Sequence, residues 1–221
     1  YRRVVEFAKE VGATHVSISQ IEKSMWQWDR DRTDPYPNWG MANATLFKVA
    51  LPEALKKYMP ADYADRNLEM FSKRAEILKE YGLKALFNGM DPAWLPNEVY
   101  RDHPAWRGPR CDQPRRARGE YYAPCTDHPE VRALYDESVR KLCSVAPIEY
   151  FTFFANDSGG GICWSSHLYP GANGPIACKY TSIADKVVDV LSVIQDAAEQ
   201  VGVKAEVGFK GCFNPDEMPS I

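Results

Sequence analysis

The feature that most constrains the fold is a regular alternation of helical and extended segments. Apolar or β-branched runs alternate with segments whose apolar residues recur every three or four positions. The pattern predicts strands at residues 14–19, 83–88, 148–154 and 204–210, and helices at residues 4–11, 62–81, 127–142 and 183–198. Strands separated by single helices run parallel and are joined by right-handed crossovers. The sequence therefore predicts an α/β protein with a parallel sheet.

The connections decide between an open doubly wound sheet and a barrel. Helix-to-strand links are short, whereas the strand-to-helix segments 20–61, 89–126 and 155–180 are long. Long loops at the carboxyl ends of strands build the active sites of eight-stranded α/β barrels. We therefore expect a TIM-type (β/α)8 barrel, with residues 1–221 forming a single partial domain of about its first four strand-helix units. The chain begins without Met inside a predicted helix, so we expect it to be either a processed chain or a piece of a longer protein.

Charge and hydropathy argue against two classes of partner. The 221 residues carry a net charge of −3, which does not supply the positive field that non-specific nucleic-acid binding requires. No run approaches the roughly 18 apolar residues of a membrane-spanning helix. We therefore expect no nucleic-acid partner and no membrane partner, while the oligomeric state and the compartment stay open.

Aromatic side chains are concentrated in the three long loops. All six tryptophans lie there, and Tyr169 and His167 lie in the third loop. Flat rings with polar tips suit sugars, whose C–H faces stack on aromatics while their hydroxyls form hydrogen bonds. The expected substrate-binding aromatics and histidine are Trp26, Trp28, Trp39, Trp94, Trp164, His167 and Tyr169. The alternative is that these tryptophans form small local cores that stabilise the loops.

Carboxylates follow the same strands. Asp91 comes after the second predicted strand and is expected to contact substrate, whereas Asp157 closes the apolar third strand. Asp157 precedes Ser158 and a run of three glycines, which allow the backbone to approach a ligand closely. Two carboxylates that flank a glycosidic bond can supply an acid and a base or nucleophile. We expect Asp157 to be catalytic, against the alternative of a solvated loop residue or helix cap.

Cysteine and histidine spacing gives no metal signature. The six cysteines contain no C-x-x-C pair, and the four histidines have no close ligand spacing. Free buried thiols are the simplest interpretation, although an even number also permits disulfides. No phosphate-binding glycine motif is present, so we expect neither a metal nor a cofactor. Five arginines between residues 107 and 118 could hold a carboxylate or phosphate, or could simply be solvated.

Three segments carry a resemblance to a known family. Residues 153–159, residues 83–88 and residues 127–131 resemble the catalytic barrel of α-glucuronidases, within the wider group of barrel glycosidases that includes hexosaminidases. The resemblance runs from residue 1 to about Phe213. In that family a turn containing Ala-Asn carries the carboxylate that protonates the leaving group. Ala155 and Asn156 match this turn, which implies that Asn156 contacts substrate.

This chain departs from the family at one position. Ser158 stands where the family has its glutamate, and Asp157 precedes it. The resemblance implies a glycoside hydrolase acting on a carbohydrate, such as a uronic-acid-containing or N-acetylated glycan, with Asp157 as general acid. A non-catalytic glycan-binding or degenerate barrel protein is the main alternative, and a metal-dependent barrel enzyme is a third. The sugar, the linkage and the stereochemistry stay open.

Overall fold

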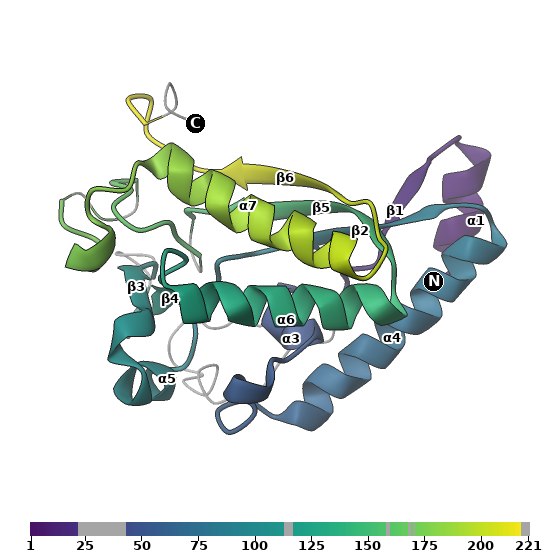
Figure 1. The fold of residues 1–221 in the computed structure, drawn as a ribbon. Helices are drawn as coiled ribbons and strands as arrows, with labels where there is room; N and C mark the ends of the chain where they lie inside the picture. Colours follow the sequence, from purple (N-terminus) through teal and green to yellow (C-terminus); the bar gives the residue numbers. More distant parts are fainter. Residues whose placement is uncertain (22–42, 113–116, 158–159, 168, 170, 218–221) are drawn as a thin grey trace.

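The fold is built around a four-stranded parallel sheet. A computed structural model describes residues 1–21, 43–112, 117–157, 160–167, 169 and 171–217. The strands are β1 (His15–Ser17), β2 (Lys84–Gly89), β5 (Ile148–Ala155) and β6 (Glu206–Gly211). They pair in the order β1-β2-β5-β6, all parallel, so strands that follow one another in this sheet are neighbours (Figure 1). The predicted parallel α/β sheet is confirmed.

The four long helices form where the sequence predicts helices, with ends that differ from the predicted ones by at most three residues. They are α1 (Arg2–Glu10), α4 (Ala61–Glu80), α6 (Pro129–Val145) and α7 (Ile183–Gln200). The His128 Nδ1 atom accepts a hydrogen bond from the Glu130 amide at 3.3 Å and caps α6. The Ser182 hydroxyl does the same for α7, accepting from the Asp185 amide at 3.0 Å. Gly82, with φ of 65°, ends the turn after α4 in the left-handed conformation.

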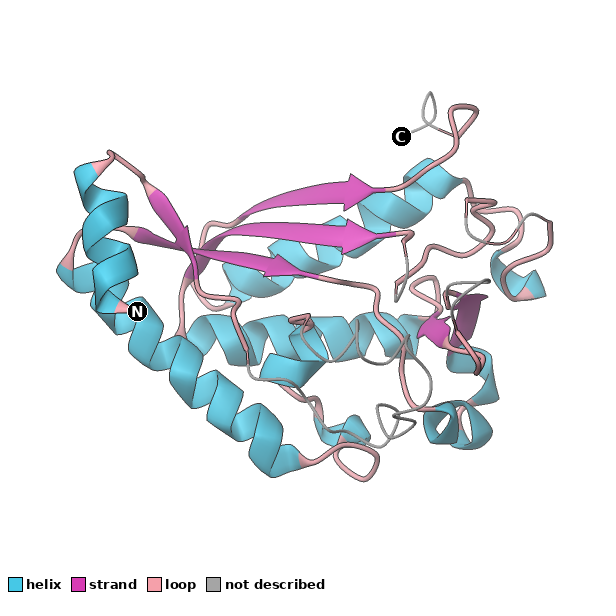
Figure 2. Cartoon of the chain, turned by 180° about the vertical axis from the view of Figure 1, so that it is seen from behind, coloured by secondary structure: helices cyan, strands magenta, loops and turns pink. Residues whose placement is uncertain are grey.

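The crossover helices cover one face of the sheet. In both Figure 1 and the reverse view of Figure 2, α4, α6 and α7 lie on the same side of the strands. Helices of a doubly wound sheet lie on both faces, whereas those of a barrel lie on the outer face alone. The layer therefore has the arrangement of consecutive barrel units. Closure into a complete barrel stays a prediction.

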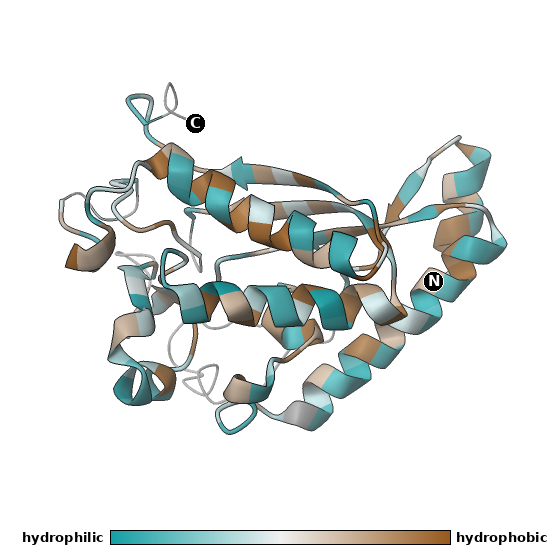
Figure 3. Ribbon diagram, in the orientation of Figure 1, coloured by the Kyte–Doolittle hydropathy of each residue, from teal (hydrophilic) through white to brown (hydrophobic). Residues whose placement is uncertain are grey.

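The main core lies between the sheet and these helices. Phe87, Phe151 and Phe153 are fully buried on the strands, and their rings lie 5.7–5.9 Å apart. Leu142 of α6 and Ile194 of α7 close the core from the helical side. The helices are amphipathic, with hydrophobic and hydrophilic residues alternating along them (Figure 3). In the described part of the chain, no helix is both long and apolar enough to span a membrane.

The long loops contain structure that periodicity did not predict. The segment after β1 holds α3 (Leu46–Val49) and η2 (Glu53–Leu55), and the segment after β5 holds η4 (Ile176–Cys178). The segment after β2 holds α5 (Asn97–Asp102), η3 (Pro104–Trp106) and the antiparallel pair β3 (Arg107–Arg110) and β4 (Tyr122–Pro124). These elements are too short to show a full helical or strand period, so their sequences read as loops.

Candidate functional site

A cavity opens at the carboxyl ends of β2 and β5. Its volume is about 270 Å³, and the described lining residues are Asn43, Ala44, Asn88, Gly89, Met90, Phe154 and Asp157. Parallel strands end at one edge of the sheet, so side chains from β2 and β5 meet there although they are far apart in sequence. This is the edge at which α/β proteins bind ligands. The expected catalytic residue, Asp157, therefore lines a cavity at the expected edge.

The turn that presents Asp157 depends on Asn156. Asn156 has a φ of 57°, a left-handed conformation that asparagine adopts more readily than most residues. Its buried Nδ2 group donates to the Ser165 hydroxyl and to the Cys212 carbonyl oxygen, each at 2.5 Å. Asn156 therefore ties the end of β5 to the loop beyond it and to the end of β6. Buried to 3% exposure, it acts as a positioning residue in this structure and not as a sugar contact.

Glu217 completes the same hydrogen-bond network. Its carboxylate accepts from the Ser166 amide at 2.8 Å, the Asn214 amide at 2.9 Å and the Ser165 hydroxyl at 3.1 Å. Burial raises the pKa of Glu217, but these donors outweigh burial and hold the pKa below its ordinary value. Glu217 is therefore an anionic anchor for the loop, suited to fixing the position of Asp157 and not to donating a proton.

Phe154 gives the cavity an aromatic wall that sequence reasoning missed. It lies on β5 and is 37% exposed, although its neighbours Phe153 and Ala155 are buried. The alternation of strand side chains turns Phe154 toward the face opposite Phe153. An exposed ring beside a carboxylate suits stacking on a sugar. Phe154 lies within a predicted apolar strand, so its sequence position is equally compatible with a side chain buried in the core.

The glycines after Asp157 serve contact between two loops. A Cβ atom on Gly160 would lie 2.7 Å from the Pro92 carbonyl oxygen. The Gly161 amide donates to that same oxygen at 3.1 Å. The expectation that these glycines make room for a ligand is thus corrected at the described positions: they let the loop after β5 lie against the loop after β2. Ser158 and Gly159 lie outside the described residues.

Asp91 is a buried structural carboxyl. It is 2% exposed, and its Oδ2 atom accepts a hydrogen bond from the Leu46 amide at 3.0 Å. Burial raises the pKa of Asp91 well above its ordinary value; the Leu46 amide and the charge of Lys48 oppose this shift without cancelling it. Oδ1 is buried and has no hydrogen-bond partner among the described groups. The expected role of Asp91 in contacting sugar does not fit this position, because no ligand reaches a side chain enclosed by protein.

We expect the Asp91→Asn variant to be more stable than the wild type at neutral pH. The pKa of Asp91 is higher in the folded protein than in the unfolded chain. Asp91 therefore destabilises the folded state increasingly as pH rises from the ordinary Asp pKa toward the folded value. Each pKa unit corresponds to about 1.4 kcal/mol. Thermal unfolding at pH 7 should show a higher Tm for the variant, and the gain should vanish below about pH 4. A lower Tm at pH 7 would contradict the assignment.

None of the described tryptophans is among the residues that line the Asp157 cavity. Trp26, Trp28 and Trp39 lie outside the described residues. Trp94 is 2% exposed and packs with Ala93, Cys111 and Ala123. Trp106 is also buried and belongs to the main core. Trp94 fits the alternative that loop tryptophans form small local cores, because the segment between β2 and α6 has an apolar cluster of its own.

The described contacts of Trp164 are structural. It packs against a group of three cysteines, and its Nε1 donates to the Pro175 carbonyl oxygen at 3.0 Å. Its φ of 70° is rare for a bulky residue. Trp164 is not among the described residues that line the Asp157 cavity.

A second cavity, of about 400 Å³, lies beside β3 and contains Arg107, Arg110, Tyr122 and Tyr169. Asp112 holds the Arg110 guanidinium through two hydrogen bonds of 2.7 and 3.1 Å. The Tyr169 hydroxyl also donates to Asp112, and its ring lies under Arg110. Tyr169 therefore belongs to this arginine pocket and not to the Asp157 cavity.

His167, the remaining expected contact, is exposed on the loop after β5, and its amide donates to the Ser165 hydroxyl at 3.4 Å.

A third cavity, of about 480 Å³, lies at the opposite end of the sheet. Lys84, Val145, Pro147 and Glu149 help to line it, and they surround the amino ends of β2 and β5. This end contributes to stability and not to catalysis in α/β barrels. The Asp157 cavity is smaller, but its carboxylate and its place at the carboxyl edge make it the candidate functional site.

Comparison with known proteins supports the fold. No protein-family model and no curated protein sequence matches this chain. Solved structures do match. The catalytic module of the multi-modular glycogen-degrading pneumococcal virulence factor SpuA has a TM-score of 0.52 and 12% identity, over 97% of this chain and 28% of that one. A GH36 α-galactosidase from Geobacillus stearothermophilus has a TM-score of 0.45 and 17% identity, over 94% of this chain and 25% of that one. An α-galactosidase from Lactobacillus brevis has a TM-score of 0.47 and 14% identity, over 95% of this chain and 24% of that one.

The chain spans about a quarter of the length of these solved structures. At 12% identity, the match to the glycogen-degrading module shows a shared fold and nothing narrower. None of these three structures is described as an α-glucuronidase or a hexosaminidase. The narrower resemblance to those enzymes therefore stays a prediction.

Proposed function

We propose that this chain is part of a barrel glycoside hydrolase in which the Asp157 cavity binds one sugar ring and Asp157 acts as general acid. The observation that carries the proposal is the juxtaposition of a loop carboxylate with an exposed aromatic ring, Phe154, in a cavity at the carboxyl edge of a parallel sheet. The fold shared with the glycogen-degrading catalytic module supports it. The activity of the complete protein belongs to the same proposal.

The lining favours a neutral ring over a uronic acid. Asn43 and Asn88 supply amide groups, Phe154 and Met90 supply apolar surface, and no arginine or lysine is among the described lining residues. A buried carboxylate on the sugar would need such a cation. A neutral hexose or an N-acetylhexosamine is the substrate class that these groups serve. A cavity of about 270 Å³ lies just below the range of about 300–1,000 Å³ for drug-sized ligands, which suits a single ring.

Glycoside hydrolysis needs a second carboxylate. Asp157 is the one carboxylate in the described lining. We propose that the partner comes from a later strand of the barrel, because catalytic residues of this fold come from the ends of several strands. Separation of the two carboxyl groups by about 5 Å would give retention, and separation by about 6.5–9.5 Å would give inversion.

The direct test uses a panel of aryl α- and β-glycosides of neutral hexoses, N-acetylhexosamines and uronic acids with the complete protein. Turnover of a neutral or N-acetylated glycoside supports the proposal. A glycan-array signal without turnover of any glycoside would replace it by the glycan-binding alternative. Preferential turnover of a uronide would overturn the substrate class.

The Phe154→Ala variant should bind the substrate more weakly. Losing one aromatic stacking contact costs about 0.5–1.5 kcal/mol, which corresponds to a rise in KM of roughly 2- to 10-fold with little change in kcat. The side chain is 37% exposed, so the fold should survive. Tyr180→Ala is the matched control, because Tyr180 is a 91% exposed aromatic that is not among the described lining of the cavity. Equal KM values for the two variants would remove Phe154 from the site.

A further inference from the structure

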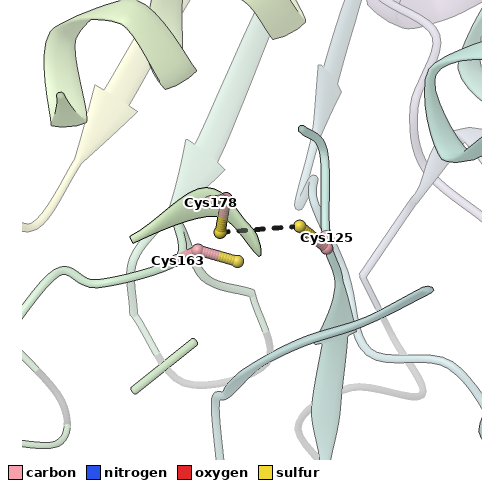
Figure 4. A group of neighbouring side chains, drawn as sticks. All are labelled: Cys125, Cys163 and Cys178. Carbon is pink, nitrogen blue, oxygen red and sulfur yellow. Dashed lines mark hydrogen bonds between the residues drawn. The ribbon is translucent and has the colours of Figure 1, made fainter. Parts of the chain in front are cut away.

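Three buried cysteines from distant parts of the chain converge at one point. Cys125 follows β4, Cys163 lies in the loop after β5, and Cys178 ends η4. They are 3%, 2% and 2% exposed and form a small cluster of their own. Figure 4 shows the three sulfur atoms close together in the space between these segments. All six cysteines of the chain carry free thiols in this structure.

The distances between the sulfur atoms suit a tetrahedral metal. The three Sγ atoms lie within 4.8 Å of one another, and those of Cys125 and Cys178 are 3.8 Å apart. Thiolates bound to zinc at about 2.3 Å in tetrahedral geometry are separated by about 3.8 Å. This is the one group of potential metal ligands that the described residues bring within such a distance. The sequence hid it, because the ligands come from two different loops.

The surroundings can accommodate the charge of a thiolate site. The Lys186 ammonium is fully buried, donates to the Cys178 carbonyl oxygen at 2.8 Å and lies 3.8 Å from the Asp127 carboxylate. Three thiolates around a divalent cation carry one net negative charge, and an adjacent buried ammonium offsets it. Thiolates are the form of cysteine that binds metal.

We propose that Cys125, Cys163 and Cys178 bind one zinc ion that ties the segment between β2 and α6 to the loop between β5 and α7. A water molecule takes the fourth position, because the described residues supply no fourth ligand within the same group. The ion has no redox role and acts as a cross-link. Cys125 and Cys178 are 53 positions apart, so the link closes a long loop and restricts the unfolded chain. The proposal is independent of the proposed glycosidase activity.

Two simpler interpretations account for less of the geometry. Free thiols that merely fill space pack as small hydrophobic groups, which explains their burial but not why three sulfur atoms from two loops lie within 4.8 Å of one another. A disulfide between Cys125 and Cys178 would require the sulfur atoms to approach from 3.8 Å to about 2.05 Å and would leave Cys163 unused. A metal uses all three sulfur atoms near their present separations.

The test measures metal in protein purified without chelators under anaerobic, reducing conditions. Elemental analysis should find about one zinc ion per chain. After removal of zinc, added Co²⁺ should give the thiolate-to-cobalt charge-transfer band and the visible d–d bands of a tetrahedral site. The variants Cys125→Ser, Cys163→Ser and Cys178→Ser should each lose the zinc. Cys143→Ala removes a thiol that is also buried but lies on α6 outside the cluster, and it should keep the zinc.

Several results would overturn the site. The first is reduced wild-type protein that contains no zinc and gives no cobalt bands. The second is copper or iron at stoichiometric amounts in place of zinc, or a disulfide as the sole linkage among the three cysteines. The third is zinc that all three serine variants retain. If the serine variants do not fold, the cobalt spectrum of the wild type decides the question. Glycosidase assays are not needed for any of these outcomes, so the two proposals fail separately.

Discussion

The Asp157→Asn variant should lose natural glycoside hydrolysis by about 10²- to 10⁴-fold in kcat, the range that a positioned general acid contributes. An amide cannot donate the proton that the leaving oxygen needs, but it keeps the size and much of the polarity of the carboxyl. KM should therefore change little, since Asp157 acts on the transition state more than on substrate binding. The measurement is steady-state kinetics of the complete protein on the best substrate of the panel.

The leaving group gives this prediction a sharper form. An aryl glycoside with a dinitrophenolate leaving group needs little protonation, so the loss of kcat should be much smaller with it than with a natural glycoside. Asp196→Asn is the matched control, because Asp196 is an exposed aspartate on α7, far in sequence from the cavity lining. Full activity of the Asp157 variant on a natural glycoside would reject the acid role. An equal loss on both substrate types would indicate a role other than proton donation.

The Asn156→Ala variant should lower the free energy of unfolding by about 2–5 kcal/mol. Placing alanine at a φ of 57° costs about 1–2 kcal/mol. Loss of the Nδ2 donor leaves the Cys212 carbonyl oxygen without this hydrogen bond, at a cost of about 1–3 kcal/mol. For a chain of this size, Tm should fall by about 2–4 °C for each kcal/mol. Chemical denaturation with an unchanged m-value would confirm that the native state is what changes.

A glycine variant separates the two contributions. Asn156→Gly tolerates the left-handed backbone but lacks the amide side chain, so it should be more stable than Asn156→Ala and less stable than the wild type. Both variants should also reduce glycoside turnover, because the turn places Asp157. An alanine variant as stable as the wild type would show that the network around Ser165 and Glu217 does not depend on Asn156.

Local sequence patterns predicted the regular elements because the information is local. The apolar stripe from Ala64 to Leu78 and the glycine after it specify α4 without reference to the rest of the chain. The capping box of Ser182 and Asp185 sets the start of α7 in the same way. Asp157 could be expected at the carboxyl edge, because strand order and direction follow from the alternation.

The rest of the site could not be read from the sequence. Asp91 and Asp157 look alike as carboxylates that follow strands, yet one is enclosed by the segment around Leu46 and the other faces a cavity. Trp94 is buried for the same reason: whether a loop aromatic meets protein or solvent depends on how separate loops pack. Phe154 shows the converse, a strand residue that the alternation leaves facing the cavity.

The succession of strands and helices, their parallel order and the edge at which the loops meet follow from local patterns, because periodicity and capping act over neighbouring residues. The tertiary structure alone decided which loop side chains meet. Only folding brings Cys125, Cys163 and Cys178 together, or sets Asn156 against Cys212, because such contacts join segments tens of residues apart and their energy depends on burial and distance.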